Sequence, residues 1–320
     1  ILDELGIPVI QTNLNVGSGS HAVQTATIMM RYEAHCLEHR PDLVIVVGDV
    51  NSTIACALTA KKLGLQVAHL ESGLRSRDLG MPEEINRLLT DRISDVLWTP
   101  SRDADENLAA EGVDRKKISF VGNLMIDSLV RLKPRIDSID IQENFGLKPH
   151  QYALLTLHRP SNVDEPERFL RIMREMERVV TELERPIVFP VHPRTRSMVE
   201  RPEVREILER SHFLLFEPLS YVKFMALVQA SQLLITDSGG IQEETTFLGI
   251  PCFTLRANTE RPITILEGTN HLVEPENLMS TIRKSLAAGP RKAHPPQYWD
   301  GQSAARVVED LFSRYWRTDA

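Results

Sequence analysis

Three acidic residues stand at the ends of predicted strands or at the start of a predicted helix in the first third of the chain. Asp49 follows an apolar run that ends in glycine, Glu71 follows the next apolar run, and Glu83 opens a predicted helix. The carboxyl ends of parallel strands meet at one edge of an open α/β sheet, so these carboxylates are expected to face one crevice. Burial and a nearby carboxylate raise the pKa of such a group, which then exchanges protons near neutral pH.

Each of these acids also has a purely structural interpretation. Asp49 could cap the following helix. Glu71 could form a surface ion pair with Arg75. Glu83 could stabilise a helix start and pair with Arg87 one turn later. The arrival of three acids from neighbouring loops favours the chemical interpretation.

Histidines follow two apolar runs in the second half of the chain. His158 and Arg159 come after the run 154–156, and His192 comes after the run 187–191. Imidazole and guanidinium groups at the end of a strand could bind or protonate a departing phosphate. A single histidine is more often structural than catalytic, so both interpretations stay open.

The turn 237–240, with the sequence Asp-Ser-Gly-Gly, is the most specific signal in the chain. It joins the apolar run 233–236 to a helix that carries Glu244 about one turn in, and Arg261 follows downstream as another cation. The glycines let the backbone approach a ligand, and the helix N-terminus offers N–H groups to a phosphate. The Glu244 carboxylate could accept both hydroxyl groups of a ribose. The run is neither a Walker motif nor G-x-G-x-x-G, so NAD and ATP are not expected.

Metal and thiol chemistry have little support. Asp103 and Asp105 spell the D-x-D signature of many sugar transferases, but they open a predicted helix, where the helix dipole favours acids. Cys36, Cys56 and Cys252 are far apart and show no zinc spacing, so they are expected to be buried thiols in a reducing compartment. We therefore predict no metal and no cofactor.

The elements that must position these groups alternate between strands and helices. Most of the predicted strands are apolar on both faces, which is typical of parallel strands covered by helices. The predicted strands are 43–47, 67–70, 96–98, 118–121, 154–156, 187–191, 213–216, 233–236 and 252–255. The predicted helices are 22–38, 53–62, 83–93, 165–183, 241–248 and 278–286. This alternation predicts a doubly wound α/β architecture.

The strands form two groups, separated by a polar stretch at 131–150 with little periodicity. We predict an N-terminal Rossmann-like domain at 1–130 and a C-terminal one at 131–301. A last helix at 304–316 places six apolar residues on one stripe, and we expect residues 302–318 to return to the first domain. The chain opens with what looks like a helix end, whereas such a layer normally begins with a strand, so the first strand of the N-terminal domain is expected to be absent.

Length and charge narrow the class of protein. The 320 residues suggest about two domains. The 37 Lys and Arg residues against 44 Asp and Glu residues give a net charge of −7 without any basic run, which argues against nucleic acid binding. No apolar stretch reaches the length of a membrane span, and Ile1 begins no signal peptide. The sequence thus favours a soluble, cytoplasmic protein.

Taken together, these segments resemble the non-hydrolysing UDP-N-acetylglucosamine 2-epimerases. The matching runs occur in family order and cover nearly the whole chain. They are Gly48-Asp49, His69-Leu-Glu71-Ser-Gly-Leu-Arg75, Pro82-Glu83-Glu84-Ile-Asn86-Arg87, Gly122-Asn123 with Ile126-Asp127, His158-Arg159, Asp237-Ser-Gly-Gly-Ile-Gln-Glu-Glu244 and Thr259-Glu-Arg-Pro262. The resemblance implies a GT-B fold with a UDP-sugar in the cleft between two Rossmann-like domains, and a homodimer.

The resemblance also implies a reaction and roles for residues. UDP leaves by anti-elimination across C1 and C2 to give 2-acetamidoglucal, and it then adds back with the proton on the opposite face. The implied catalytic residues are Asp49, Glu71, Glu83 and His158. Arg87 would position or charge-balance the acids, and Phe224 would lie near the uracil. With the histidine and cation found above, the predicted substrate-binding set is Arg87, His192, Phe224, Ser238, Gly239, Gly240, Glu244 and Arg261.

Several alternatives stay open at this point. After His158 and Arg159 the typical Arg-Glu-Asn of the family is replaced by Pro160-Ser-Asn162. That variant also suits relatives that act on more decorated sugars, such as UDP-2,3-diacetamido-2,3-dideoxyglucuronic acid. A GT-B glycosyltransferase, a hydrolysing 2-epimerase and an inactive UDP-sugar-binding fragment are the other candidates.

Overall fold

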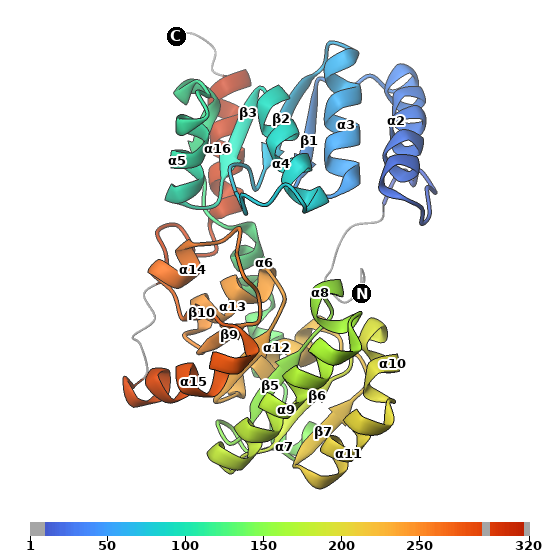
Figure 1. Cartoon of the computed structure of the whole chain (residues 1–320). Coiled ribbons are helices and arrows are strands. Elements are labelled where there is room, and N and C mark those ends of the chain that lie inside the picture. Colours follow the sequence, from blue (N-terminus) through green and yellow to red (C-terminus); the bar gives the residue numbers. More distant parts are fainter. Residues whose placement is uncertain (1–9, 290–294, 317–320) are drawn as a thin grey trace. The chain divides into compact units, whose positions relative to one another are not determined.

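The structure is a computed structural model that describes residues 10–289 and 295–316. Its contacts divide these residues into two compact units (Figure 1). The N-terminal unit comprises residues 10–127 and 297–316, and the C-terminal unit comprises residues 128–289 with 295–296. The helix α6, Leu124–Asp137, crosses the division between the units. The domain limits expected from the sequence, after residues 130 and 301, stay a prediction.

The N-terminal unit is built on a parallel four-stranded sheet in the order β1-β2-β3-β4. Its strands are β1 Leu43–Val47, β2 Gln66–Leu70, β3 Val96–Thr99 and β4 Ile118–Phe120. Its helices besides α6 are α2 His21–Glu38, α3 Asn51–Lys62, α4 Pro82–Ile93, α5 Arg102–Ala110 and α16 Ser303–Tyr315. Val47 is paired with Leu70, so the loops that follow β1 and β2 leave the sheet side by side.

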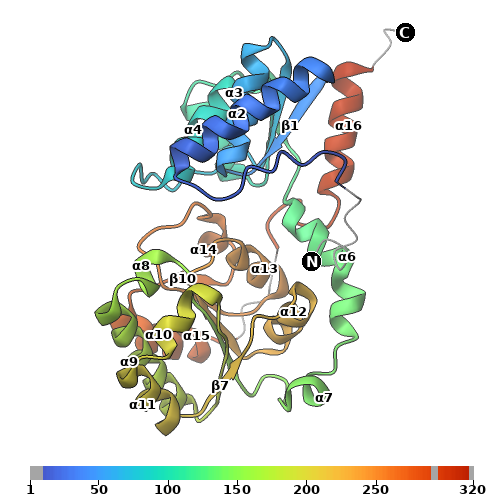
Figure 2. The same cartoon turned by 90° about the vertical axis from the view of Figure 1, so that its right-hand side faces the viewer.

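Helices cover both faces of this sheet, as the apolar strands predicted. Val44 and Val46 of β1 pack with α2 and α3 in one core cluster. Trp98 of β3 packs with Val307 of α16 in the cluster on the other side. Figure 2 shows β1 between α3 and α16. The C-terminal helix therefore belongs to the N-terminal unit.

The C-terminal unit contains a six-stranded parallel sheet in the order β10-β9-β8-β5-β6-β7. Its strands are β5 Ala153–Thr156, β6 Ile187–Pro190, β7 Phe213–Phe216, β8 Leu233–Thr236, β9 Cys252–Thr254 and β10 Asn270–Leu272. The longer helices are α9 Pro166–Leu183, α11 Pro202–Arg210, α12 Tyr221–Ala230, α13 Gly240–Leu248 and α15 Leu278–Ala287. The shorter ones are α7 Ile141–Phe145, α8 Pro160–Val163, α10 Arg196–Val199 and α14 Ile263–Leu266. The strand order reverses between β5 and β8, and such a switch point is where ligands bind in open α/β sheets.

Three sequence-based expectations about local structure were wrong. The polar stretch 131–150 is partly helical, because α6 continues to Asp137 and buries Leu132 and Ile136 one turn apart. The strand β10 was missed because its three residues lack an apolar run. The apolar stripe on α16 is only partly buried, since Val307 is buried whereas Phe312 is 59% exposed. Cys56 is half-buried, whereas Cys36 and Cys252 are buried as expected.

Two further expectations concern chain ends and membranes. The helix end expected at the start of the chain falls on residues 1–9, which lie outside the described residues. The last two residues of the returning segment, 317–318, also lie outside them. Among the helices that the structure describes, none has the length and apolar character needed to cross a membrane.

Candidate active site

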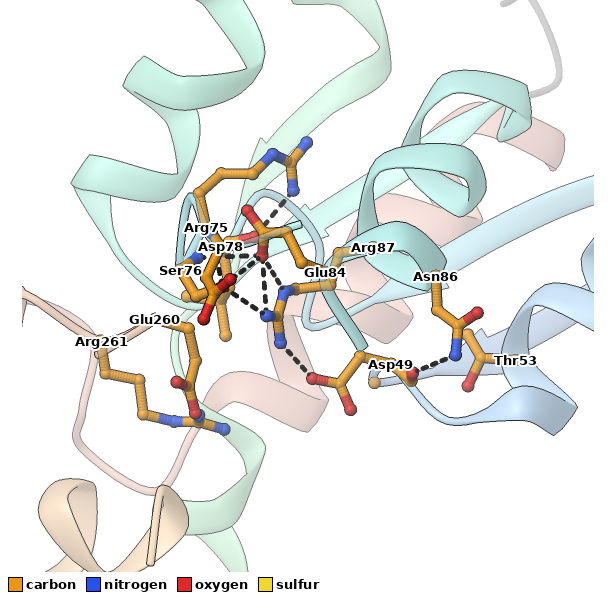
Figure 3. A network of polar contacts seen from close by, with 12 residues as sticks. Asp49, Thr53, Arg75, Ser76, Asp78, Glu84, Asn86, Arg87, Glu260 and Arg261 are labelled. Atoms are coloured by element: carbon orange, nitrogen blue, oxygen red, sulfur yellow. Dashed lines mark hydrogen bonds and ion pairs between the residues drawn. The ribbon is translucent and has the colours of Figure 1, made fainter. Parts of the chain in front are cut away.

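The loop after β1 holds Asp49 in place through contacts with α4. Gly48 has a φ of +67°, which turns the chain at the end of the strand, and its N–H donates to the Leu70 carbonyl at 3.0 Å. The Asn86 side-chain amide donates to the Asp49 carbonyl oxygen at 2.8 Å. The Arg87 guanidinium forms an ion pair with the Asp49 carboxylate (Figure 3). Two predicted site residues, Asp49 and Arg87, are thus brought together.

Glu71 lies beside this loop at the end of β2. A Cβ atom placed on Gly48 would lie 3.4 Å from the Glu71 Oε2 atom, so that carboxylate sits against the glycine that precedes Asp49. Glu71 itself has a backbone φ of +70°, which residues other than glycine rarely adopt. Backbone conformations of this kind cost about 1–3 kcal/mol and concentrate at functional sites. The geometry therefore groups Glu71 with Asp49.

Glu84 is the acid of α4 that organises the loop after β2. Its buried carboxylate accepts hydrogen bonds from the Ser76 N–H at 2.9 Å, the Arg77 N–H at 2.8 Å and the Arg87 Nε atom at 2.9 Å (Figure 3). Burial opposes ionisation, but these amide and guanidinium donors outweigh it and lower the pKa of Glu84. Glu84 therefore acts as an anion that anchors the loop.

The structural alternative in which Glu83 pairs with Arg87 is not what the structure shows. Arg87 is paired with Glu84, three residues earlier, and with Asp49. Glu83 is half-buried at the start of α4, and its catalytic role stays a prediction. The spacing of three residues between Glu84 and Arg87 was a readable signal for this pair, since both three- and four-residue spacings bring helix side chains together.

His69 forms a second buried network that sequence reasoning missed. Its Nδ1 atom lies 2.6 Å from the Asp91 Oδ1 atom, and its Nε2 atom lies 2.8 Å from the Gly48 carbonyl oxygen. Both partners only accept hydrogen bonds, so both ring nitrogens must donate and the ring is an imidazolium. Burial disfavours this charge, yet the hydrogen bond and negative charge of Asp91, the Gly48 carbonyl and the charge of Glu71 together outweigh it, and the pKa of His69 is raised. The ring thereby ties the Gly48 turn to α4.

Arg75 completes this network from the loop after β2. Its Nη1 atom lies 2.7 Å from Asp91, and its Nε atom lies 2.7 Å from Glu111. Two carboxylates therefore balance a guanidinium that is itself buried. His69 and Asp91 are 22 residues apart in the chain, and no local spacing could have predicted their contact.

In the C-terminal unit, Asp237 joins the loops that follow β5 and β8. Its buried carboxylate accepts hydrogen bonds from the N–H groups of His158 and Arg159, each at 3.0 Å, and from the Asn162 side chain at 3.1 Å. The His158 Nδ1 atom lies 3.0 Å from it. Burial would raise the pKa of Asp237, but His158 and these donors lower it. With Nδ1 turned to the carboxylate, His158 keeps Nε2 for a ligand.

His192 lies next to His158, as expected for two groups at neighbouring strand ends. The two ring centroids are 5.5 Å apart. The His192 Nδ1 atom accepts a hydrogen bond from the Arg194 N–H at 3.2 Å. Burial and the neighbouring His158 lower the pKa of His192, so this ring is neutral near pH 7.

The turn at residues 238–240 is shaped by a close approach of side chains. A Cβ atom on Gly239 would lie 2.6 Å from the Glu260 Oε1 atom and 3.0 Å from the Arg261 Nη1 atom, so a larger residue would have to displace the ends of these two side chains. Helix α13 begins at Gly240, and the first N–H groups of a helix point out of its N-terminus. Ser238, Gly239 and Gly240 thus form a compact turn that can receive an anion.

Arg261, predicted as a cation for the substrate, is surrounded by acids. Its guanidinium pairs with Glu243 at 2.9 Å and with Glu260. Glu260 also binds Arg256 at 2.8 Å, and although burial opposes ionisation, these two arginines lower the pKa of Glu260 to about 2. The positive charge of Arg261 is therefore already shared, and its contact with substrate stays a prediction.

Glu244 lies in α13 and is 3% exposed. The Tyr221 hydroxyl donates a hydrogen bond to its Oε1 atom at 2.7 Å. Burial raises the pKa of Glu244 to about 7. No role was predicted for Tyr221, whereas Phe224, expected near the uracil, is half-buried one turn further along α12.

Metal ligation has no candidate in the described ranges, where no group of three or more His, Cys, Asp or Glu side chains could hold an ion. Asp103 and Asp105 lie in the first turn of α5, as predicted. Burial raises the pKa of both carboxyl groups, which disfavours the pair of anions that a divalent cation requires.

Comparison with known proteins gives one consistent result. A family model described as UDP-N-acetylglucosamine 2-epimerase matches residues 1–311. The UDP-N-acetylglucosamine 2-epimerase of Methanococcus maripaludis is 38% identical over 316 residues, which is 97% of this chain and 86% of that protein. The UDP-2,3-diacetamido-2,3-dideoxy-D-glucuronate 2-epimerase of Pseudomonas aeruginosa is 38% identical over 97% of this chain and 85% of that protein.

A solved structure agrees in fold. The crystal structure of Methanocaldococcus jannaschii UDP-GlcNAc 2-epimerase in complex with UDP-GlcNAc and UDP superposes with a TM-score of 0.87 at 38% identity. The match covers 98% of this chain and 87% of that chain. The two Rossmann-like parallel sheets are accordingly those of a GT-B-like fold.

Proposed function

Because the chain belongs to the UDP-N-acetylglucosamine 2-epimerase family, of the non-hydrolysing type, we propose that it interconverts UDP-GlcNAc and UDP-ManNAc. The reaction proceeds by anti-elimination of UDP to 2-acetamidoglucal and re-addition of UDP. The observation that carries the proposal is the switch point of the C-terminal sheet, where the 238–240 turn and His158 meet around Asp237. This is an anion site beside an imidazole, as a departing diphosphate requires.

The acids of the N-terminal unit supply the proton chemistry in this proposal. The proton at C2 is not acidified by a neighbouring carbonyl, so its removal needs a well-positioned carboxylate together with the loss of UDP. Asp49 is paired with the Arg87 guanidinium, and Glu71 lies against the same turn. We assign Asp49, Glu71 and Glu83 to the acid–base steps and Arg87 to charge balance.

The C-terminal unit binds the nucleotide in this proposal. Ser238, Gly239 and Gly240 receive the diphosphate, and His158, with His192 beside it, donates to the departing oxygen. Glu244 accepts the ribose hydroxyls, Phe224 contacts the uracil, and Arg261 adds positive charge. No cofactor or metal is required, because the elimination needs only acid–base groups and hydrogen-bond donors.

A second substrate has one specific observation in its favour. The relative from Pseudomonas aeruginosa, named for UDP-2,3-diacetamido-2,3-dideoxy-D-glucuronate, is as similar to this chain as the relative named for UDP-GlcNAc. Directly after His158 and Arg159 in the sequence, the chain forms the short helix α8, whose buried Asn162 side chain contacts Asp237. We therefore keep the decorated sugar nucleotide as the alternative substrate.

The proposal is tested by incubating the enzyme with each UDP-sugar in D2O and following C2 by NMR. We expect deuterium at C2 and formation of the manno epimer. The absence of both with every sugar would contradict an epimerase, whereas stoichiometric free UDP would indicate hydrolysis. Transfer that needs an added acceptor would indicate a glycosyltransferase.

A matched pair of variants tests whether Asp49 takes part in the reaction. Asp49→Asn should lower the exchange rate by about 10²–10⁴-fold, the usual contribution of an acid–base group. Asp42→Asn is the control, because Asp42 is exposed at the opposite end of β1. Equal rates for the two variants would remove Asp49 from the reaction. A homodimer and a cytoplasmic location stay predictions, and sedimentation can test the first.

A further inference from the structure

Glu244 is a buried acid with too few hydrogen-bond donors for a charge. Its side chain is 3% exposed, and in the part of the chain that the structure describes, the Tyr221 hydroxyl is the one group that donates to it. An ionised carboxylate offers about four lone-pair positions, and buried charges are costly unless they are paired. A single neutral donor does not compensate this cost.

The elements packed against α13 do not bring a compensating cation to Glu244. These elements are α12, α14, β9 and β10. Arg261 and Arg256, which lie before α14, are engaged with Glu243 and Glu260. The ionisable side chains within the packed elements are Tyr221, Lys223, Cys252 and His271.

None of these side chains acts as a counter-charge. Lys223 is exposed on the surface of α12. Cys252 is a neutral thiol, because burial raises its pKa to about 11. His271 stacks on the Phe253 ring, with 5.3 Å between the ring centroids. Burial is accordingly the dominant influence on Glu244, and it favours the protonated form.

We propose that Glu244 carries a proton in the empty site and releases it when the 2′,3′-diol of a nucleotide ribose binds. The diol brings two O–H donors to the carboxylate, and donors of this kind stabilise the anion over the neutral acid. The proton leaves the carboxyl oxygen for solvent, and no other bond is made or broken. Tyr221 is a positioning residue that keeps one carboxylate oxygen in place. This inference rests on the proposed function, and it adds a proton linkage to nucleotide binding.

The linkage has a definite direction with pH. Since the ligand binds the ionised form, nucleotide affinity should fall about tenfold per pH unit below about pH 7 and level off above it. The sugar-linked diphosphate of a UDP-sugar has no terminal phosphate that titrates near neutrality, so a UDP-sugar is the proper ligand. A histidine that gains a proton on binding phosphate would take protons up, which is the opposite sign.

Isothermal titration calorimetry with UDP-GlcNAc in two buffers of different ionisation enthalpy counts the protons exchanged. We expect release of close to one proton per nucleotide at about pH 6 and close to none at about pH 9. The Glu244→Gln variant should bind more weakly and release none. A UDP-sugar with 2′-deoxyribose should release less than the ribose form.

The outcomes separate this inference from the proposed function. Tight binding without proton release at about pH 6, or the same release from Glu244→Gln, would overturn the inference and leave the epimerase intact. Loss of all nucleotide binding by the wild-type protein would instead overturn the proposed function. Thermal unfolding of Glu244→Gln without ligand shows that the variant is folded.

Discussion

Glu84 in the N-terminal unit and Glu244 in the C-terminal unit are buried to nearly the same extent, at 1% and 3% exposed. Their pKa values nevertheless move in opposite directions, because Glu84 receives an arginine and two backbone N–H groups whereas Glu244 receives one phenol. Burial therefore does not decide the charge of these acids. The number and charge of the hydrogen-bond donors around each carboxylate decide it.

This contrast separates scaffold from binding site. The N-terminal unit surrounds its buried acids with cations, as Asp91 with His69 and Arg75 also shows, and the result is a fixed loop that presents Asp49 and Glu71. Glu244 is left with unused acceptor capacity, which is a cost in the empty protein and an advantage when a ligand brings hydroxyl groups.

Removing the cation from the N-terminal network should have the largest effect. Arg87→Met leaves Glu84 buried without its charged partner, and breaking a buried ion pair costs about 3–5 kcal/mol. Urea denaturation measures this change in the free energy of unfolding. Arg92→Met, at an exposed position of the same helix, is the control and should change it by less than about 0.5 kcal/mol. A similar small loss for Arg87→Met would show that Glu84 does not need its cation.

Neutralising Glu244 should stabilise the empty protein above neutral pH. Its pKa rises from 4.5 to about 7 on folding, so the folded state holds the proton more tightly and stability falls as pH rises between those values. Glu244→Gln abolishes this loss, and it should raise the free energy of unfolding by up to about 3 kcal/mol at about pH 9 and by little at about pH 4. Urea denaturation across this pH range is the measurement.

The same substitution at Glu84 should have the opposite sign. The pKa of Glu84 is lowered on folding, so its ionised form stabilises the protein above the unfolded pKa and this contribution is lost as pH falls through the folded pKa. Glu84→Gln should therefore destabilise at neutral pH and approach the wild type in acid. If the free energy of unfolding changed with pH in the same way for Glu84→Gln and Glu244→Gln, the two acids would not differ in the charge they carry.

The sequence allowed the strands and the positions of the loops to be predicted, because these depend on local patterns. The strand β8, Leu233–Thr236, is buried on both faces and was placed to the residue. Asp49 and the 238–240 turn were expected at strand ends, which is where they lie. The strand β10 was missed, since pairing with β9 rather than its composition makes it a strand.

The partners of the site residues could not be predicted in the same way. Glu83 and Glu84 lie at helix spacings of four and three from Arg87, and both spacings allow an ion pair. The amides of Ser76 and Arg77 select Glu84, and their position depends on how the loop after β2 folds. Which acid carries a shifted pKa was for this reason hidden in the sequence.

Removing the Tyr221 donor to Glu244 should have the smallest effect, and it is the most sensitive test of the difference between Glu84 and Glu244. Tyr221→Phe deletes a hydrogen bond to the charged form, worth about 1–2 kcal/mol, so the pKa of Glu244 should rise further. The pH at which UDP-GlcNAc affinity levels off should then move up by about one unit. Tyr152→Phe is the matched control, because the Tyr152 hydroxyl donates to the Leu227 carbonyl and not to an acid. If both variants keep the wild-type pH profile, Tyr221 does not govern the charge of Glu244, and the difference from Glu84 must come from the arginine and backbone donors at Glu84 alone.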